Sequence, residues 1–543
     1  MKRNTKKIIA LTTLAISSIG LIFAQDDSAE VTSFASTDDA EAASSVNVAG
    51  EASVNVRSYV DKDDVTVDEF SDLQNLPIDS NPEAKLNVEY SSGNADANIK
   101  LNFNSNVIKN HPEDVIDELT LRGYFGNFNV EAGKMKVVWG KGDKLHVIDN
   151  FNADDYTDFI IPDYLDRRIS TPMLRGVYNF GVGNLQLEAV YTPFLPTDRF
   201  ATSGNWTPAA YSSLYNTVYN VEEAKVAKTF SSYTNATALA SEISTLKTLA
   251  YGSNGSYTDL NALQKLQTIM TMYGFTSEDD VTSYVAKCGT EYMSALTEAS
   301  SYSANILYPD TNSLKYSQAG ARLTGTVGSF DYGLSYYYGH YKQPTVDWTN
   351  YLASYVANSG VSYANPSLKY DTKQTLGVEA ATVLWHFNLR GEAAYNLTED
   401  TDGTDPYTHN NSVQWVGGFD IDIPLNNMNI NVQETGTYIL NNDKITDSNA
   451  FDADYNANGK YTNNKLVFNV SDSWMNDKIV PEVSVLWGIE NNDVLVMPKL
   501  TYKQSDGLSF ALSGMYIWCK DDNSEFASWK DNSFVNFAVK CQF

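Results

Sequence analysis

The sequence is poor in the residues from which most catalytic and metal sites are built. Its 543 residues include only three cysteines and five histidines. An odd cysteine count does not fit a disulfide framework, and no cysteine or histidine cluster has the spacing of zinc ligands. The chain also lacks Gly-x-Ser-x-Gly, and its histidines lie in no recognisable nucleophile motif: His111, His146, His340, His386 and His409. We therefore predict no enzymatic activity and no cofactor, apart from a calcium hypothesis discussed below.

Long apolar segments are missing after residue 24. Four basic residues within the first seven positions precede a mostly apolar stretch of 16 residues, Ile8 to Phe23. This stretch is shorter than the roughly 20 residues that a membrane-spanning helix needs. The pattern predicts a secretory signal peptide over residues 1–24, cleaved after Ala24, and export through the Sec route. Residues 25–45 are acidic and predict a flexible periplasmic tail.

Positive charge is scarce: 38 Lys and Arg stand against 67 Asp and Glu, a formal net charge of −29. This balance argues against binding to nucleic acid or to anionic lipid headgroups. Aromatic residues are abundant, with 35 Tyr, 23 Phe and 9 Trp, although the mean hydropathy is negative. The apolar residues mostly occupy every second position, which favours strands over helices.

The end of the chain has the clearest alternation. Val535, Phe537, Val539, Cys541 and Phe543 share one face, and the positions between them are mainly polar or small. Similar segments of about ten residues recur between turns, as is typical of barrels that cross a membrane.

Eighteen such segments can be identified. Connections after even-numbered segments are short, and the long ones follow odd-numbered segments, with Asn491-Asn492 as the exception. An up-and-down barrel alternates in this way, whereas a secreted β-sandwich or β-solenoid has no such asymmetry. We predict an all-β fold: a single transmembrane antiparallel up-and-down β-barrel over residues 46–543, with about 18 strands and 16 as the alternative. The predicted strands begin near residues 46, 84, 95, 117, 127, 172, 183, 316, 329, 373, 386, 412, 427, 463, 478, 493, 507 and 532.

Two features resemble bacterial outer-membrane β-barrels of the porin type. A strand that ends the chain on Phe543 is similar to the C-terminal signal of these barrels, which implies recognition by the barrel-assembly machinery. Trp139-Gly140, followed by the Asp/Asn-rich residues 149–156, resembles a segment of an uncharacterised outer-membrane barrel family. That family has Asn-Pro-x-Asp here, whereas Ala153 follows Asn152 in this chain. The resemblance implies an outer-membrane location and says nothing of a substrate.

The polar faces of the strands should line the lumen. The charges there are nearly balanced, so they either form opposed ladders or pair locally between neighbouring strands. The predicted lumen-lining residues are Arg57, Lys85, Lys100, Arg122, Arg175, Arg322, Arg390, Glu51, Glu89, Asp96, Glu131, Glu188, Asp331, Glu379 and Glu392, together with Lys499, Lys540, Asp420 and Glu482.

One connection, residues 195–315, has a different composition, rich in Ala, Ser, Thr and Tyr. Helical periodicity in Val221 to Phe230, Ala238 to Leu249 and Leu260 to Met272 predicts a helical extracellular insertion. It can constrict the pore or form an outer cap, and the sequence leaves both open. Cys541 and Cys519 point to opposite faces and cannot form a disulfide. The sequence is compatible with a disulfide between Cys288 and Cys519 and also with free thiols.

Asp454-x-Asn456-x-Asn458-Gly459 matches the first half of a calcium loop of the EF-hand type, in which side-chain oxygens converge on a hard cation. Lys465 stands where a bidentate Glu is needed, so a solvated turn is the alternative to a metal site.

A barrel of this size leaves an aqueous channel unless something fills it. We therefore predict a porin-like channel for passive diffusion or uptake of small solutes, surrounded by outer-membrane lipid and open to homo-oligomer formation. The alternatives are a surface adhesin anchored by the barrel and a plugged transporter for hydrophobic compounds.

Overall fold

The computed structural model describes residues 44–60, 78–252, 255–301, 307–445, 451–456, 458–522 and 524–543. The predicted signal peptide and nearly all of the acidic tail lie outside these residues. The chain divides into two compact units. The barrel unit comprises the chain up to Ala210, Pro309–Thr345 and Lys369–Phe543, and the second unit comprises Tyr211–Tyr308 and Val346–Leu368.

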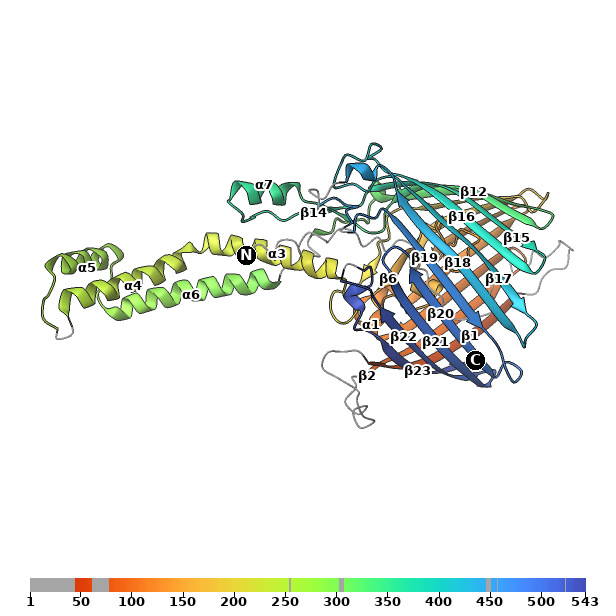
Figure 1. Cartoon of the computed structure of the whole chain (residues 1–543), viewed down its shortest axis with the longest axis horizontal. Helices are drawn as coiled ribbons and strands as arrows, with labels where there is room; N and C mark the ends of the chain where they lie inside the picture. Colours follow the sequence, from red (N-terminus) through yellow and green to blue (C-terminus); the bar gives the residue numbers. More distant parts are fainter. Residues whose placement is uncertain are drawn as a thin grey trace. The chain divides into compact units, whose positions relative to one another are not determined.

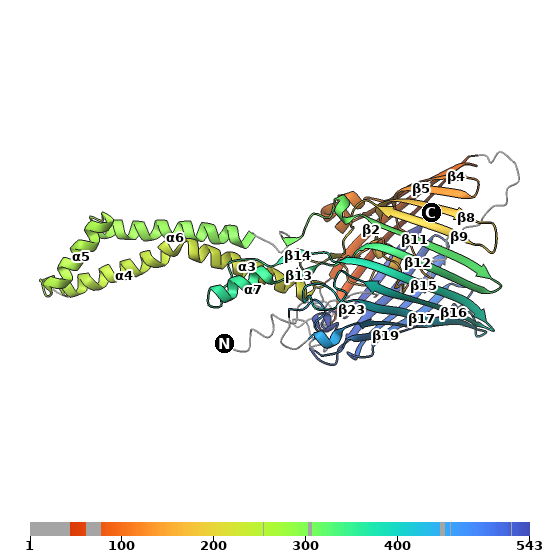
Figure 2. The same cartoon turned by 90° about the horizontal axis from the view of Figure 1, so that it is seen from above.

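The barrel unit is a closed antiparallel sheet of 18 strands (Figures 1 and 2). Neighbouring strands in the sequence pair with each other, and β1 pairs with β23 to close the sheet. This confirms the predicted up-and-down barrel of 18 strands. Its strands are β1 (Ser45–Tyr59), β2 (Ile78–Ser91), β3 (Ala95–Asn104), β4 (Ile116–Phe125), β5 (Phe128–Met135), β8 (Thr171–Asn179), β9 (Gln186–Thr192), β11 (Gln318–Val327), β12 (Phe330–His340), β15 (Thr372–Leu384), β16 (Phe387–Leu397), β17 (Ser412–Ile423), β18 (Met428–Ile439), β19 (Thr462–Ser471), β20 (Ile479–Gly488), β21 (Asp493–Ser505), β22 (Leu508–Trp518) and β23 (Phe534–Gln542).

Seventeen of the strands begin within three residues of their predicted starts, and β2 begins six residues early, at Ile78. The reason lies in the register with β1, where Ile78 to Glu83 pair with Ser58 to Ser53. Asn81-Pro82 looks like a turn in sequence. Pairing with β1 holds it in the sheet nevertheless.

Short turns occupy one end of the barrel. In the two-residue turns after β4 and β11, Gly126 and Gly328 take the first central position with φ +64°. Glycine suits this position because hairpin turns that match the strand twist need positive φ there. The C-terminal residue lies at the same end, where the backbone of Phe543 exchanges two hydrogen bonds with Gly50.

The other end carries the long connections, and these contain the smaller elements of the barrel unit. They are α1 (Ser105–Asn110), η2 (Pro112–Asp114), β6 (Ala153–Tyr156), α2 (Tyr164–Arg167), β7 (Arg168–Ile169), β10 (Arg199–Phe200), η4 (Leu314–Tyr316), η5 (Asn442–Lys444) and η6 (Ala527–Trp529). The short strands β13 (Thr345–Asp347) and β14 (Ser367–Lys369) pair with each other.

Large apolar side chains cover the outside of the barrel. Leu121, Leu334, Leu376, Leu512 and Tyr516 are each at least half exposed. Leu334 and Leu376 lie on the faces opposite Asp331 and Glu379 of their strands. Such a surface is stable in hydrocarbon and unfavourable in water. Among the described residues no helix is both long and apolar enough to span a bilayer.

The second unit is helical, as the periodicity predicts. It contains α3 (Ala209–Thr229), α4 (Ser231–Tyr251), α5 (Leu260–Tyr273), α6 (Glu278–Ser301) and α7 (Thr349–Ala357), where α3 begins in the last residues of the barrel unit. Ile243, Leu246 and Leu266 form a buried core between α4 and α5. A second contact joins Leu214 to Leu368, so two connections that are distant in sequence build one unit. Cys288, Cys519 and Cys541 are all free thiols.

Candidate functional site in the barrel lumen

The connection between β5 and β8, Lys136–Ser170, contacts strands on opposite sides of the barrel. On one side, Arg57 of β1 donates to Asp158 with a 2.6 Å N–O distance. On the other side, Lys373 of β15 donates to Asn150 at 2.7 Å, and Asn431 of β18 donates to Asp143. The connection therefore crosses the lumen, and we call it the lumen segment.

At the tip of the lumen segment, residues 142–147, one carboxylate of the barrel wall makes three contacts. Glu392 of β16 accepts hydrogen bonds from the backbone N–H groups of Gly142 and Val147, at 2.7 and 2.9 Å. Its Oε1 also lies 2.8 Å from Nδ1 of His146. The Glu392 side chain is fully shielded from solvent. Breaking a buried charged acceptor away from these donors would leave several polar groups unsatisfied.

Glycine at position 140 is required by this contact. Gly140 has φ +127°, and a Cβ atom there would overlap the Glu392 carboxylate and the His146 ring. The Trp139-Gly140 pair noticed in the sequence therefore lies where the lumen segment approaches Glu392 and His146.

The base of the lumen segment is closed by Asn152. Its amide donates to the carbonyl oxygens of Met135 and Ile169 at 3.0 and 2.9 Å, and its Oδ1 accepts from Val137 N–H. One buried side chain thus joins the end of β5 to Ile169, near the end of the lumen segment. Arg168 supports it by donating to the Asn152 carbonyl and pairing with Asp149.

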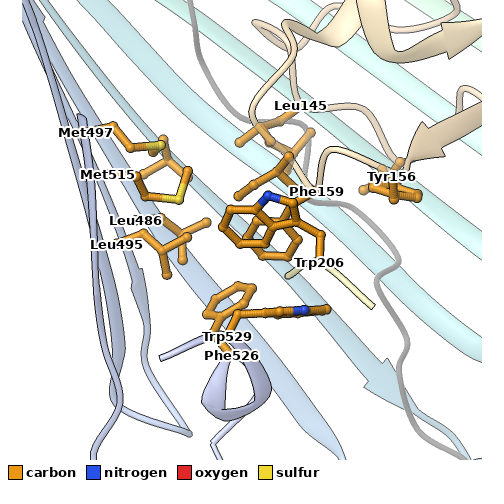
Figure 3. Close-up of a cluster of buried hydrophobic side chains, with 14 of the residues drawn as sticks. Leu145, Tyr156, Phe159, Trp206, Leu486, Leu495, Met497, Met515, Phe526 and Trp529 are labelled. Atoms are coloured by element: carbon orange, nitrogen blue, oxygen red, sulfur yellow. The ribbon is translucent and has the colours of Figure 1, made fainter. Parts of the chain in front are cut away.

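An apolar cluster attaches the lumen segment to the wall formed by β20–β22 (Figure 3). Phe159 stacks on Trp206 at 5.0 Å and contacts Trp529 at 4.3 Å between ring centroids. The wall contributes apolar residues that are almost completely buried, among them Leu495 and Met497. Inward positions here are apolar because the lumen segment, and not water, covers them.

Six of the predicted lumen residues form a continuous ladder of alternating charge across β4, β5, β8, β9, β11 and β15. N–O distances along it are 3.1 Å for Arg122–Glu131, 3.1 Å for Glu131–Arg175 and 2.7 Å for Arg175–Glu188. Arg322 continues it, at 3.9 Å from Glu188 and 2.6 Å from Glu379. Glu379 reaches Arg322 across β12 because Gly333 has no side chain there.

The other predicted lumen residues lie on the same faces in smaller groups. Lys85 pairs with Asp166 of the lumen segment at 2.9 Å, and Asp331 pairs with Lys141 at 3.5 Å. The remaining contacts are Lys100–Glu118, Arg390–Asp420, Lys540–Glu51, Asn87–Glu89, Tyr124–Asp96 and Asn469–Glu482. Local pairing describes these charges better than two separated ladders of opposite sign. Lys499, on β21, belongs to the same face and pairs in register with Glu482.

Among the polar cavities of the barrel unit, two are lined in part by the lumen segment. One, of about 1230 Å³, lies toward the short-turn end and is lined by Asp143, Arg390, Asp420, Asn431 and neighbouring residues of β16–β20. The other, of about 650 Å³, is lined by the inward residues of β1–β3 and by the lumen segment, including Arg57, Lys85, Asp158 and Asp166. The lumen segment contributes to both cavities.

The predicted calcium residues lie in the connection between β18 and β19. Both carboxylate oxygens of Asp454 are hydrogen-bonded within the protein, one near His409 Nδ1 at 3.0 Å and the other to Asn410 N–H. Asn456 Oδ1 accepts from the Asn458 backbone N–H at 2.8 Å, as in an Asx turn. Burial lowers the pKa of His409, but attraction to Asp454, the bond to Asp454 and attraction to Asp371 outweigh it and raise the pKa overall. Asp454 thus has a partner in the fold, and calcium binding stays a prediction.

Sequence reasoning did not identify the lumen segment as the element that crosses the barrel. Length and composition drew attention to residues 195–315, whereas Lys136–Ser170 is short and polar in composition. Its apolar residues that pack in the lumen, such as Phe151, Phe159 and Ile160, follow neither a helical nor a strand period. The sequence signals in this segment were Trp139-Gly140 and the Asp/Asn-rich residues 149–156, and neither indicated a path through the lumen.

The barrel is closed, has 18 antiparallel strands, an apolar exterior and a charged interior, and contains a segment folded across its lumen. These features define the class of membrane-spanning β-barrels. The chain is a closed, 18-stranded β-barrel of the membrane-spanning type.

No protein-family model matches the sequence, and no curated protein has significant sequence similarity to it. Solved structures with a similar fold include OccK11 (OpdR) of Pseudomonas aeruginosa, at 7% identity over 92% of this chain and 96% of that chain, with a TM-score of 0.39. OpdO of Pseudomonas aeruginosa has 8% identity, the same coverages and a TM-score of 0.40. The outer membrane channel DcaP of Acinetobacter baumannii has 10% identity over 92% and 97% of the two chains, with a TM-score of 0.36. The fold assignment depends on the strand pairing of this chain and not on these similarities.

Proposed function

We propose that the protein is a passive diffusion channel for small polar solutes in a bacterial outer membrane. The observation that carries the proposal is the lumen segment, which narrows an 18-stranded barrel while polar cavities of about 1230 and 650 Å³ remain beside it. Because these cavities remain, we propose that the lumen segment narrows the pore without filling it. The proposed mechanism involves no chemistry: the apolar exterior faces lipid, and polar side chains replace part of the solute's hydration shell.

The proposal also includes the orientation of the barrel, the position of the helical insertion, and the assembly and export of the chain. The short-turn end faces the periplasm, and residues 195–315 lie on the outside with the long connections. Phe543 serves the assembly machinery, and export uses the Sec route. The apolar inward residues Leu495 and Met497 are covered by the lumen segment, which gives a transporter for hydrophobic compounds less support than a polar pore.

The test is single-channel conductance of the whole folded protein in a planar bilayer, beside its Glu392→Ala variant. We expect steady conductance steps from the native protein. The variant removes the acceptor of three contacts at the tip of the lumen segment, so we expect larger or noisier steps. Glu89→Ala is the matched control, since Glu89 accepts within the sheet from Asn87 and fixes no part of the lumen segment.

Silence of all three proteins, after folding is verified by heat-dependent electrophoretic mobility, would refute the channel. Equal conductance for all three would keep the channel but would show that the Glu392 contacts do not define its width.

A further inference from the structure

We propose that the pore selects for uncharged, hydroxyl-rich solutes of the small-sugar class and discriminates little between cations and anions. This inference rests on the proposed channel function and adds its substrate class. It follows from how the interior charges are partnered and from which groups cover the cavities.

The charged ladder has no net charge. It contains three arginines, Arg122, Arg175 and Arg322, and three glutamates, Glu131, Glu188 and Glu379, in strict alternation. The three glutamate side chains are no more than 11% exposed, and the Arg322 side chain is 12% exposed. Each arginine is paired with at least one carboxylate of the wall, and the side chains of Arg122 and Arg175 are 33% and 31% exposed. A passing anion gains little from a guanidinium that is already paired.

The cavities repeat this pattern where the lumen segment meets the wall. In the smaller cavity, Arg57 pairs with Asp158 and Lys85 pairs with Asp166. In the larger cavity, Arg390 pairs with Asp420 and lies 3.8 Å from Asp143. The lumen segment thus places its own carboxylates against basic residues of the wall. The further carboxylates of the larger cavity, Asp422 and Glu482, accept from the amides of Asn429 and Asn469.

Side-chain amides supply many of the remaining polar groups. Seven asparagines line the smaller cavity, and five asparagines and Gln433 line the larger one. An amide offers both a donor and an acceptor, and it carries no charge. A solute hydroxyl group also donates and accepts, so a polyhydroxylated solute can exchange its hydration for such a lining at small cost. An ion cannot, because amides replace its hydration less well than opposite charges do.

The first experiment measures two properties of the native protein in lipid. In a potassium chloride gradient across a planar bilayer, we expect a reversal potential close to zero. In liposome swelling, we expect arabinose or glucose to enter about threefold or more faster than gluconate or glucosamine of similar size, since the charged solutes lose hydration without gaining an unpaired partner.

Two opposite substitutions in the ladder test its neutrality. Glu188→Gln removes a negative charge between Arg175 and Arg322, and we expect the permeability ratio to shift toward anions by about twofold or more. Arg175→Gln removes a positive charge beside Glu188, and we expect a shift toward cations. A loss of fold would not reverse sign between the two variants.

Glu434→Gln is the matched control. Glu434 lies on β18 at a position that faces away from the lumen, where it accepts from Nε1 of Trp415 at 2.9 and 3.2 Å. The substitution makes the same change of charge outside the pore, so the reversal potential should stay at the native value.

Conductance with strong native ion selectivity, or faster entry of gluconate or glucosamine than of the sugars, would overturn the inference and leave the channel intact. Unchanged selectivity in both ladder variants would overturn the role given to the ladder. Absence of any conductance or swelling in the folded native protein would instead refute the proposed function.

Discussion

At the scale of single residues, the interior depends on a few buried polar side chains that make several hydrogen bonds each. Glu392 holds the tip of the lumen segment, Asn152 closes its base, and Asp454 orders an outer connection through His409 and Asn410. The sequence separations differ widely, from 15–17 residues for the contacts of Asn152 to 250 residues for Glu392 and Gly142. Such residues fix loops for which propensity alone gives no unique conformation.

The His409–Asp454 contact predicts a pH dependence of stability. The pKa of His409 is raised in the folded protein, because Asp454 and Asp371 outweigh the effects of burial and of nearby Lys373. A raised pKa means that the folded state binds the proton more tightly than the unfolded state. The stabilisation is therefore complete below the ordinary histidine pKa of about 6.5 and is lost as the pH rises through the folded value.

Urea unfolding in lipid vesicles between pH 5 and 9 measures this effect. We expect the native protein to lose part of its stability toward high pH. The His409→Gln variant, which cannot take up the proton, should lose less over the same range. Parallel pH profiles for the two proteins would contradict the assignment to His409.

At the scale of elements, the strands and the lumen segment are stabilised in different ways. The strands gain from pairing around a closed sheet and from apolar side chains exposed to lipid. The lumen segment has little regular structure, and its order depends on wall contacts and on the aromatic cluster around Phe159. Its stability should therefore respond to substitutions in that cluster.

Phe159→Ala removes a fully buried ring that contacts Trp206, Phe526 and Trp529. We expect a loss of about 3–5 kcal/mol in the free energy of unfolding, because the lost transfer energy adds to the cost of the cavity. Phe125→Ala is the comparison, since that ring belongs to the last residue of β4 and is 67% exposed. Similar unfolding curves for the two variants would mean that the cluster does not hold the segment.

The strands could be predicted from the sequence, whereas the lumen segment could not. Alternation in β23, from Val535 to Phe543, depends on neighbours two positions apart and is visible locally. The path of Lys136–Ser170 depends on Glu392, Lys373 and Asn431, which are contributed by later strands. No local pattern in the segment indicates those partners.

At the scale of the whole molecule, two units with separate cores share one chain. The barrel unit is built around the sheet and the lumen segment, and the helical unit has its own core around Ile243 and Leu266. The prediction of helices in residues 195–315 is confirmed, and their external position remains a proposal.

Deleting residues 211–308 tests whether the helices affect conduction. Because the lumen segment already crosses the barrel, we expect the deletion to change single-channel conductance by less than about twofold. Heat-dependent electrophoretic mobility should show that the barrel still folds. A severalfold rise in conductance would instead mean that the helical unit obstructs the pore.

The sequence by itself indicated the barrel, a strand number of 16 to 18 and the alternation of long and short connections, because a two-residue period and turn residues are local signals. The pairing in the folded sheet decided for 18 strands. The sequence also indicated which charged residues share the inward faces. The tertiary structure decided which of these charges pair and which connection enters the lumen. Those outcomes depend on closure of the sheet, which brings β1, β15 and β16 around Lys136–Ser170 although they are far apart in the chain.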